Sequence, residues 1–218
     1  MVVVNFKAYK SGTGQQALQL AQACQRVKDR EGVEIILLPQ TADLYRLSQS
    51  VNLSVWSQHV DPVGSGAHTG AILPETIKAA GATGTILNHA ERKIPLKVIG
   101  ETAMRVKKIG LTVLVCCDSL EEAREVALLR PDYLAYEPPE LIGNRKTSVA
   151  AARPGVIADF VKQFSALPIV VGAGIHSADD VRVSLRLGAK GILVASDVVL
   201  AKDPEKELTE LARGFDKN

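Results

Sequence analysis

The feature that most constrains the fold of this chain is a unit that recurs eight times along its 218 residues. Each unit has a short run of β-branched or aliphatic residues, then a loop, then an amphipathic stretch that ends near a glycine. The apolar runs predict strands, and the amphipathic stretches predict helices. The strands are expected at residues 2–4, 34–38, 53–55, 85–87, 112–115, 133–136, 169–171 and 191–194. The helices are expected at residues 15–30, 42–49, 74–80, 96–109, 120–129, 154–164, 178–187 and 204–215.

Strands that alternate with helices in this way indicate an α/β protein with a parallel sheet. The strands read apolar on both faces, as expected where helices cover the sheet. Eight such units close naturally into a (β/α)8 barrel, and 218 residues is an ordinary length for one. Ser119 and Ser177 have capping-box spacing, and Asp203 with Pro204 begins the last expected helix. No break in composition divides the chain, so we predict one domain over residues 1–218.

Composition and charge narrow the class of protein further. Hydrophobic residues make up 46% of the chain, which is enough for a full core and excludes intrinsic disorder. The net charge is only +2, its cations are dispersed and aromatics are 4%, so we expect no nucleic-acid partner. Three cysteines without a C-x-x-C pair predict buried, reduced thiols. The apolar run at the N-terminus is too short for a signal or membrane segment, so we expect a cytoplasmic protein without membrane contact.

The stretch from Asp132 to Thr147 is the most informative part of the chain. Glu137 directly follows an expected strand, and α/β proteins place their ligands at the carboxyl ends of strands. Two prolines after Glu137 stiffen the exit from the strand. The following loop, up to Thr147, has the composition of a segment that opens and closes over a site. The alternative reading is an acidic loop residue before a proline turn.

Other polar or small residues also follow expected strands. They are Asn5, Lys7, Gln58, His89, Gly172, Ala173, Gly174, Ala195 and Ser196. Small residues before a capped helix let backbone N–H groups approach phosphate oxygens, and phosphate sites of barrels lie beside strands seven and eight. The set therefore suits proton transfer on a small anion, and its small residues favour a phosphorylated one. The four histidines lack the spacing of zinc ligands, so we expect no metal and no cofactor.

Two of these residues have more than one reading. His89 precedes a turn at 90–92 that could be helical, and a helix N-terminus favours a neutral imidazole. A hydrogen-bonded structural histidine is the alternative. Lys7 could be a surface lysine, the usual fate of this residue, or a Schiff-base nucleophile.

Five motifs together resemble the triosephosphate isomerase family, in its shorter archaeal-type branch. They are Asn5-Phe6-Lys7, Asn88-His89-Ala90-Glu91-Arg92, Tyr136-Glu137-Pro138 with Ile142-Gly143, Gly172-Ala173-Gly174-Ile175, and Gly66-Ala67-His68-Thr69-Gly70. They occur in the family's order and span essentially the whole chain. The resemblance implies a (β/α)8, or TIM, barrel.

The resemblance also implies an aldose–ketose isomerase of glycolysis and gluconeogenesis. It would interconvert D-glyceraldehyde 3-phosphate and dihydroxyacetone phosphate through an enediolate. Glu137 would be the base and neutral His89 would polarise the carbonyl, a division of roles known for this family. Lys7 with Asn5 would stabilise the developing charge. The phosphate contacts would be Ile142, Gly143, Gly174, Ala195 and Ser196, beside Asn5 and Lys7.

The resemblance further implies self-association as a homodimer or a homotetramer. The loop that carries Thr69 would reach the neighbouring subunit's site. The expected helix at 96–109 could offer an additional interface, or simply its core face.

Three residues depart from the family's pattern, namely Ala90 and, in the expected lid, Asn144 and Arg145. Ala90 stands where the family usually has serine, so Glu137 should lack a resting contact with a hydroxyl. Arg145 replaces a glycine in the expected lid, where a positive φ would be strained.

Two other functions stay open at this point. Another phosphate-binding barrel enzyme, such as a Schiff-base aldolase or a synthase of the indole-glycerol-phosphate type, would need a reactive lysine in a central or later strand. The other is a barrel kept only as a binding protein, in which Ala90 and Arg145 would be signs of decay.

Overall fold

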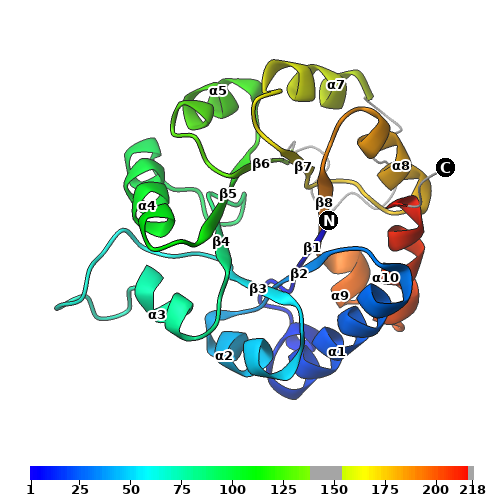
Figure 1. Cartoon of the computed structure of the whole chain (residues 1–218), viewed down its shortest axis with the longest axis horizontal. Coiled ribbons are helices and arrows are strands. Elements are labelled where there is room, and N and C mark those ends of the chain that lie inside the picture. Colours follow the sequence, from blue (N-terminus) through cyan, green and yellow to red (C-terminus); the bar gives the residue numbers. More distant parts are fainter. Residues whose placement is uncertain (138–153, 216–218) are drawn as a thin grey trace.

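The computed structural model describes residues 1–137 and 154–215, and eight parallel strands form a closed barrel in it (Figure 1). The strands are β1 (Val2–Asn5), β2 (Ile35–Leu38), β3 (Ser54–Ser57), β4 (Gly84–Leu87), β5 (Thr112–Cys117), β6 (Tyr133–Tyr136), β7 (Ile169–Val171) and β8 (Gly191–Val194). β1 closes the barrel because Val2 pairs with Ile35 of β2 on one side and with Ile192 of β8 on the other. The predicted (β/α)8 fold is confirmed.

Helices surround the barrel and cover its outer face (Figure 1). They are α1 (Gly14–Glu31), α2 (Thr41–Ser50), α3 (Pro74–Ala79), α4 (Leu96–Lys108), α5 (Leu120–Leu128), α7 (Pro154–Gln163), α8 (Ala178–Arg186), α9 (Ser196–Val199) and α10 (Pro204–Ala212), with 3-10 turns Lys10–Gly12 and Arg213–Phe215. None of the described helices is both long and apolar enough to cross a membrane.

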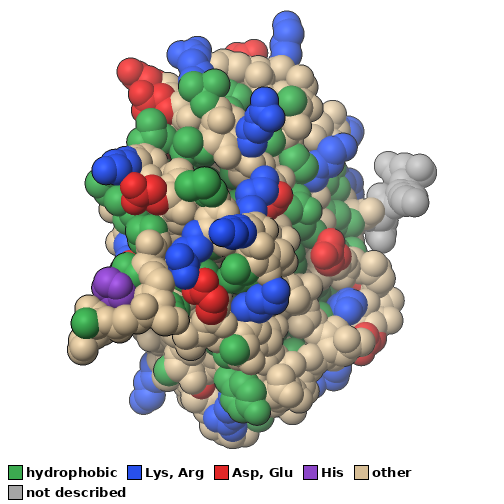
Figure 2. Space-filling model, turned by 60° about the vertical axis from the view of Figure 1, so that its left-hand side comes forward, with side chains coloured by type: hydrophobic (Ala, Val, Ile, Leu, Met, Phe, Trp, Pro, Cys, Tyr) green, Lys and Arg blue, Asp and Glu red, His purple; other side chains and the backbone are tan. Residues whose placement is uncertain are grey.

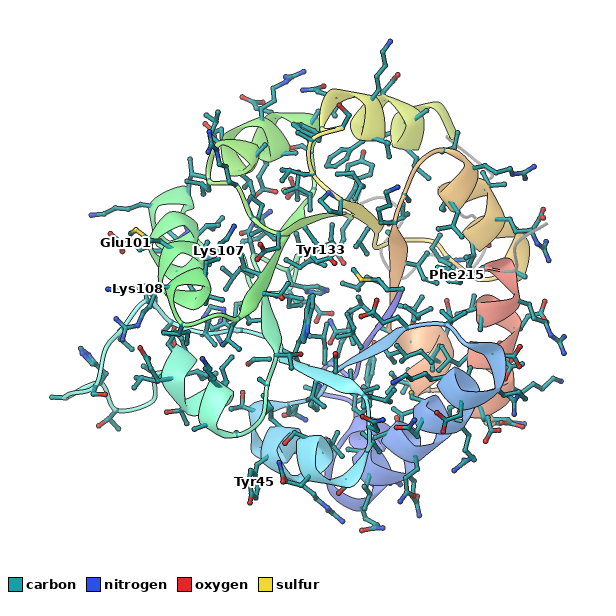
Figure 3. All side chains as sticks on the ribbon, viewed as in Figure 1. Tyr45, Glu101, Lys107, Lys108, Tyr133 and Phe215 are labelled. Atoms are coloured by element: carbon teal, nitrogen blue, oxygen red, sulfur yellow. The ribbon has the colours of Figure 1, made fainter. Side chains whose placement is uncertain are left out.

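The alternation of side chains along each strand divides the core into two layers. Val3 belongs to a cluster inside the barrel, whereas Val2 and Val4 pack between the barrel and its helices. Tyr133 packs against the inner cluster and points into the barrel, while Tyr45 points away from α2 into solvent (Figure 3). Both faces of the strands are therefore buried, as their apolar sequences predict.

Most predicted elements agree with the structure within one or two residues. α9 was not predicted, because its four residues are too few to show helical periodicity. The last predicted helix ends at Ala212 and continues as a 3-10 turn. The predicted caps are present: Ser119 Oγ and Ser177 Oγ each accept a backbone N–H three residues on, as does Asp203. The assignment of all 218 residues to one domain stays a prediction.

A long arm between β3 and α3 projects from the barrel (Figures 1 and 2). Asp61 closes its base, since the Asp61 N–H donates to the Ile72 carbonyl at 2.9 Å and the Asp61 Oδ2 accepts from the Ile72 N–H at 2.7 Å. Residues 65–70 at the tip are exposed. Two hydrogen bonds therefore hold the base of the arm, and its tip is open to solvent.

Candidate active site

The predicted site residues follow the strands and gather at the carboxyl end of the barrel. Two positions beyond an inner-cluster residue, the chain again faces the barrel axis. That relation holds for four of the predicted residues, which are Asn5 after Val3, Glu137 after Ala135, Gly172 after Val170, and Ala195 after Leu193. A cavity of about 220 Å³ lies among them. Its lining includes Lys7, His89, Glu137, Gly172, Gly174, Ala195 and Ser196.

Glu137 is the most deeply buried carboxylate of this site. Its N–H still pairs with the Cys117 carbonyl at 2.9 Å, so the backbone extends β6 by one residue. The side chain is only 3% exposed, and its Oε1 lies 3.5 Å from His89 Nε2. Oε2 is buried without a hydrogen-bond partner among the described residues. A carboxylate oxygen left without a partner is costly, which points to a functional reason for its position.

Burial raises the pKa of the Glu137 carboxyl above its usual range. His89, a hydrogen bond from the Cys116 thiol and the Lys7 ammonium oppose this shift without cancelling it. Burial and the Glu137 carboxylate in turn raise the pKa of Cys116, so its thiol stays a donor. A carboxylate with a raised pKa is a stronger base, as proton abstraction requires.

The tautomer of His89 follows from its backbone contacts. His89 Nδ1 accepts the Glu91 N–H at 3.1 Å, so a neutral ring carries its proton on Nε2, the atom that faces Glu137. The predicted helical turn is a single isolated turn, closed by the Arg92 N–H on the His89 carbonyl, and α4 begins only at Leu96. The contact that sets the tautomer therefore comes from a local backbone donor and not from the N-terminus of a helix.

Lys7 is held in a left-handed conformation, with φ 47°, which is unfavourable for a residue with a Cβ. Its N–H donates to Asn5 Oδ1 at 2.9 Å, and Gln58 Nε2 donates to its carbonyl at 3.1 Å. Its Nζ lies 2.7 Å from Glu91 Oε1. Asn5 and Gln58 thus stabilise a strained backbone that directs an ammonium group into the cavity.

The other side of the cavity is made of small residues and backbone. Gly174 has φ 64°, and Ala195 and Ser196 form the entry to α9. Two further predicted phosphate contacts, Ile142 and Gly143, lie outside the described residues, as do Arg145 and the whole predicted lid at 138–147. Within residues 1–137 and 154–215, no three His, Cys, Asp or Glu side chains group as metal ligands would.

The methyl side chain of Ala90 offers no hydroxyl to Glu137. The loss of a resting contact through Ala90 stays a prediction.

Sequence reasoning missed three contributions to this site. Glu91 was read only as part of a motif, but it pairs with Lys7 and fixes the tautomer of His89. Cys116 was read only as a buried thiol, but it lies against Glu137. Gly172 was read as part of a phosphate loop, but it also makes room for Glu137. The place of Cys116 on the inner face of β5, directly after Leu114 in the inner alternation, was the one available signal.

Substitution of Gly172 tests how closely the site constrains the Glu137 side chain. A Cβ at this position would lie 2.5 Å from Glu137 Cγ and 3.0 Å from Oε1, so the Gly172→Ala side chain must displace the glutamate. We expect kcat to fall about tenfold to a hundredfold, because small misplacements of a reacting group are costly. The matched control is Gly155→Ala in α7, where a Cβ meets no atom within 4 Å. Equal kcat values for the two variants, measured at saturating substrate, would contradict this role of Gly172.

Comparisons with known proteins agree over nearly the whole chain. The family model for triosephosphate isomerase matches residues 1–213. The triosephosphate isomerase of Saccharolobus solfataricus is 44% identical over 209 residues, which cover 94% of this chain and 92% of that protein. Those of Methanothermus fervidus and Methanobacterium bryantii are 41% and 40% identical over 215 residues, covering 97% of this chain and 96% and 95% of theirs.

Proposed function

The chain belongs to the triosephosphate isomerase family and interconverts D-glyceraldehyde 3-phosphate and dihydroxyacetone phosphate in glycolysis and gluconeogenesis, and we propose that Glu137 and His89 carry its proton transfers. The observation that carries this proposal is the 3.5 Å approach of His89 Nε2 to a buried Glu137 Oε1 inside one cavity. A base and a hydrogen-bond donor side by side are what an enediolate mechanism needs.

The steps follow from the two groups. The Glu137 carboxylate removes a proton from the carbon next to the substrate carbonyl, while His89 Nε2–H donates to the carbonyl oxygen. The Glu137 carboxyl then returns the proton to the former carbonyl carbon, while His89 gives its Nε2 proton to the former carbonyl oxygen and takes one from the neighbouring hydroxyl oxygen. The carbonyl group thereby changes place, which converts ketose to aldose or the reverse. The Lys7 ammonium lies in the same cavity and stabilises the negative charge as it develops. Asn5 acts through the backbone of Lys7.

We place the phosphate group of the substrate at the opposite side of the cavity. Gly174, Ala195 and Ser196 line it there, and small residues let backbone N–H groups come close to phosphate oxygens. Ile142 and Gly143 complete this proposal on the grounds of family resemblance alone. We also propose a cytoplasmic location, where the three free, buried cysteines would stay reduced.

The Schiff-base alternative is disfavoured by the surroundings of Lys7. A Schiff base forms from a neutral amine, whereas Lys7 Nζ is held by Glu91 in an ion pair at 2.7 Å. The alternative of a binding protein without catalysis is disfavoured by Glu137. A buried carboxylate with an oxygen that lacks a partner in the described part of the chain weakens the fold and would bring no benefit to a protein that only binds.

A coupled assay tests the proposal directly. Purified protein is mixed with glyceraldehyde 3-phosphate, and the formation of dihydroxyacetone phosphate is followed for wild type, Glu137→Gln and Glu125→Gln. Glu125 is an exposed glutamate of α5 and serves as a matched control. Conversion by wild type and Glu125→Gln but not by Glu137→Gln supports the assignment. Absence of conversion by a folded wild type would overturn it and favour the binding protein.

We further propose that the arm between β3 and α3 makes a homodimer. Beside the active site a second cavity, of about 190 Å³, is lined by Asn5, Lys7, Gln58, His59, Glu91 and Arg92. It could receive the exposed tip with Thr69 from a second copy, as a two-fold interface requires each copy to offer both arm and socket. The arm of one subunit would then support Lys7 of the other.

An apolar surface on two helices supports pairing of such dimers into a tetramer. Met104 of α4 is 70% exposed and Leu128 of α5 is 83% exposed, and these two helices pack together. Such large apolar side chains in solvent favour association. Apolar and charged side chains are interspersed on the face turned forward in Figure 2.

Light scattering after size exclusion gives the test of assembly. We expect wild type to have the mass of four chains, and Met104→Glu with Leu128→Glu to have the mass of two with activity retained. Thr69→Arg in the arm should reduce both mass and activity. A double glutamate variant that keeps four chains would contradict the role of the α4 and α5 surface.

A further inference from the structure

A pair of side chains joins the two segments at the phosphate end of the cavity. His176 follows Gly174 by two residues, and Asp197 follows Ser196 in the first turn of α9. His176 Nδ1 lies 2.6 Å from Asp197 Oδ2, a distance typical of a charge-assisted hydrogen bond. Both side chains line the cavity together with His89 and Glu137. Neither residue belongs to the motifs by which the chain resembles its family.

The backbone of His176 is fixed by the start of α8. Its N–H donates to Asp180 Oδ2 at 3.1 Å, and Ser177 Oγ donates to the same oxygen at 2.8 Å. The start of α8 therefore holds the backbone of His176, and its Nδ1 reaches Asp197 in the first turn of α9. The pair is about a quarter exposed, with 26% for His176 and 28% for Asp197, so solvent protons can reach it.

The charged residues that line the cavity indicate what this pair could do. Among the described residues that line the cavity, Lys7 is the one lysine or arginine, and Glu91 already pairs with it. Glu137 and Asp197 add two more carboxylates. A phosphate dianion would therefore meet a lining with excess negative charge unless a histidine carries a proton. Asp197 is the carboxylate next to the small residues of the phosphate end.

We propose that His176 is a further substrate-binding residue, whose protonated imidazole is held by Asp197 and offsets negative charge beside the substrate phosphate. This inference rests on the proposed position of the phosphate at Gly174, Ala195 and Ser196. Loss of the proton from His176 leaves the Asp197 carboxylate facing the phosphate, so the affinity for the phosphate group falls. The chemistry of proton transfer lies elsewhere in the cavity, so kcat at saturating substrate changes little.

Other charged groups face His176 and must be accounted for. Asp180 of α8 and Asp197 of α9 contact it directly. A second cavity, of about 510 Å³, lies on its other side and is also lined by Lys202, Asp203, Lys206 and Glu207. Lysine and carboxylate side chains ordinarily keep their charge between about pH 6 and pH 9, whereas histidine loses its charge there. Within the active-site cavity, His89 and Glu137 are the other groups whose change of charge could affect anion binding over this pH range.

Sulfate is a suitable probe because it mimics a phosphate dianion and keeps both charges over this range. Its dissociation constant is measured by calorimetry at pH 6 and pH 9, which requires no catalytic activity. We expect the constant for wild type to rise roughly fivefold or more with pH. His176→Asn keeps a donor for Asp197 but no charge, so it should bind more weakly at pH 6 and lose most of the pH dependence. Asp197→Asn should bind more tightly than wild type at pH 9.

These variants separate a charge from a structural role. A merely structural histidine would weaken sulfate binding in His176→Asn by the same factor at both pH values, and that result would overturn the inference. Retention of the full pH dependence in His176→Asn would overturn it too, because it would assign the titration to His89 or Glu137. In steady-state kinetics the inference expects a raised KM with kcat within about twofold of wild type. An isomerase that is active but binds no sulfate at either pH would refute this inference and leave the proton-transfer roles intact.

Discussion

Glu137→Gln is expected to lower kcat by about a thousandfold or more. Removal of a positioned general base ordinarily loses up to about 10⁴-fold. Glutamine keeps the shape of the side chain but cannot accept the substrate proton. Its backbone N–H, bonded to the Cys117 carbonyl, is unaffected. The measurement is the initial rate in both directions, with Glu125→Gln of α5 as the control. A loss confined to KM would show that Glu137 binds substrate without moving a proton.

The same substitution is expected to stabilise the protein at neutral pH. Burial raises the pKa of Glu137 above the 4.5 of an ordinary glutamate. The folded protein therefore holds this proton at pH values where the unfolded chain has lost it. The contribution to stability is fully present below about pH 4.5 and is lost as the pH rises through the raised pKa. Glutamine does not titrate, so the free energy of unfolding of Glu137→Gln does not fall in this way as the pH rises.

Denaturant unfolding at several pH values measures this effect. The free energy of unfolding of Glu137→Gln should exceed that of wild type by at least about 1 kcal/mol at pH 7. A buried carboxylate charge, with one oxygen lacking a partner among residues 1–137 and 154–215, is replaced by a neutral amide. The difference should shrink towards pH 4.5. A difference that stays constant with pH would contradict the raised pKa. Loss of activity with a gain of stability is what a residue selected for chemistry should show.

The sequence allowed the barrel and the position of its site to be predicted for one physical reason. Apolar runs mark the strands, and the ligands of such barrels bind where the strands end, so a residue such as Glu137, directly after an apolar run, is expected in the site. Strand patterns are local and readable. The family motifs then supplied roles for Glu137 and His89 that periodicity alone left open.

Contacts between loops could not be predicted in this way. Glu91 and Lys7 are 84 positions apart, and His176 and Asp197 are 21 apart, so no pattern within one element joins either pair. The space that Gly172 leaves for Glu137 depends on two strands lying side by side. The strain at Lys7 is equally hidden, because Lys has no preference for a positive φ.

Lys7→Gly is expected to lose activity about a hundredfold to a thousandfold while it stabilises the fold. Removal of one charged or donating group from a developing anion typically has this effect on kcat. Glycine adopts φ 47° without the strain that a Cβ causes. After subtraction of the flexibility that glycine adds to the unfolded chain, we expect a gain of about 0.5–1 kcal/mol.

Two variants make the Lys7 prediction specific. Arg130→Gly is the matched control, because Arg130 has φ 51° after α5 and does not line the active-site cavity. It should gain similar stability with kcat unchanged. Lys7→Met keeps the strain but removes the charge, so it should lose activity without the gain in stability. If Lys7→Met kept wild-type kcat, the ammonium would have no part in the reaction. If Lys7→Gly were less stable than Lys7→Met, the left-handed backbone would not be strained. Together these results would show that the strained backbone at Lys7 lowers the stability of the fold and that the position of its ammonium group serves the reaction.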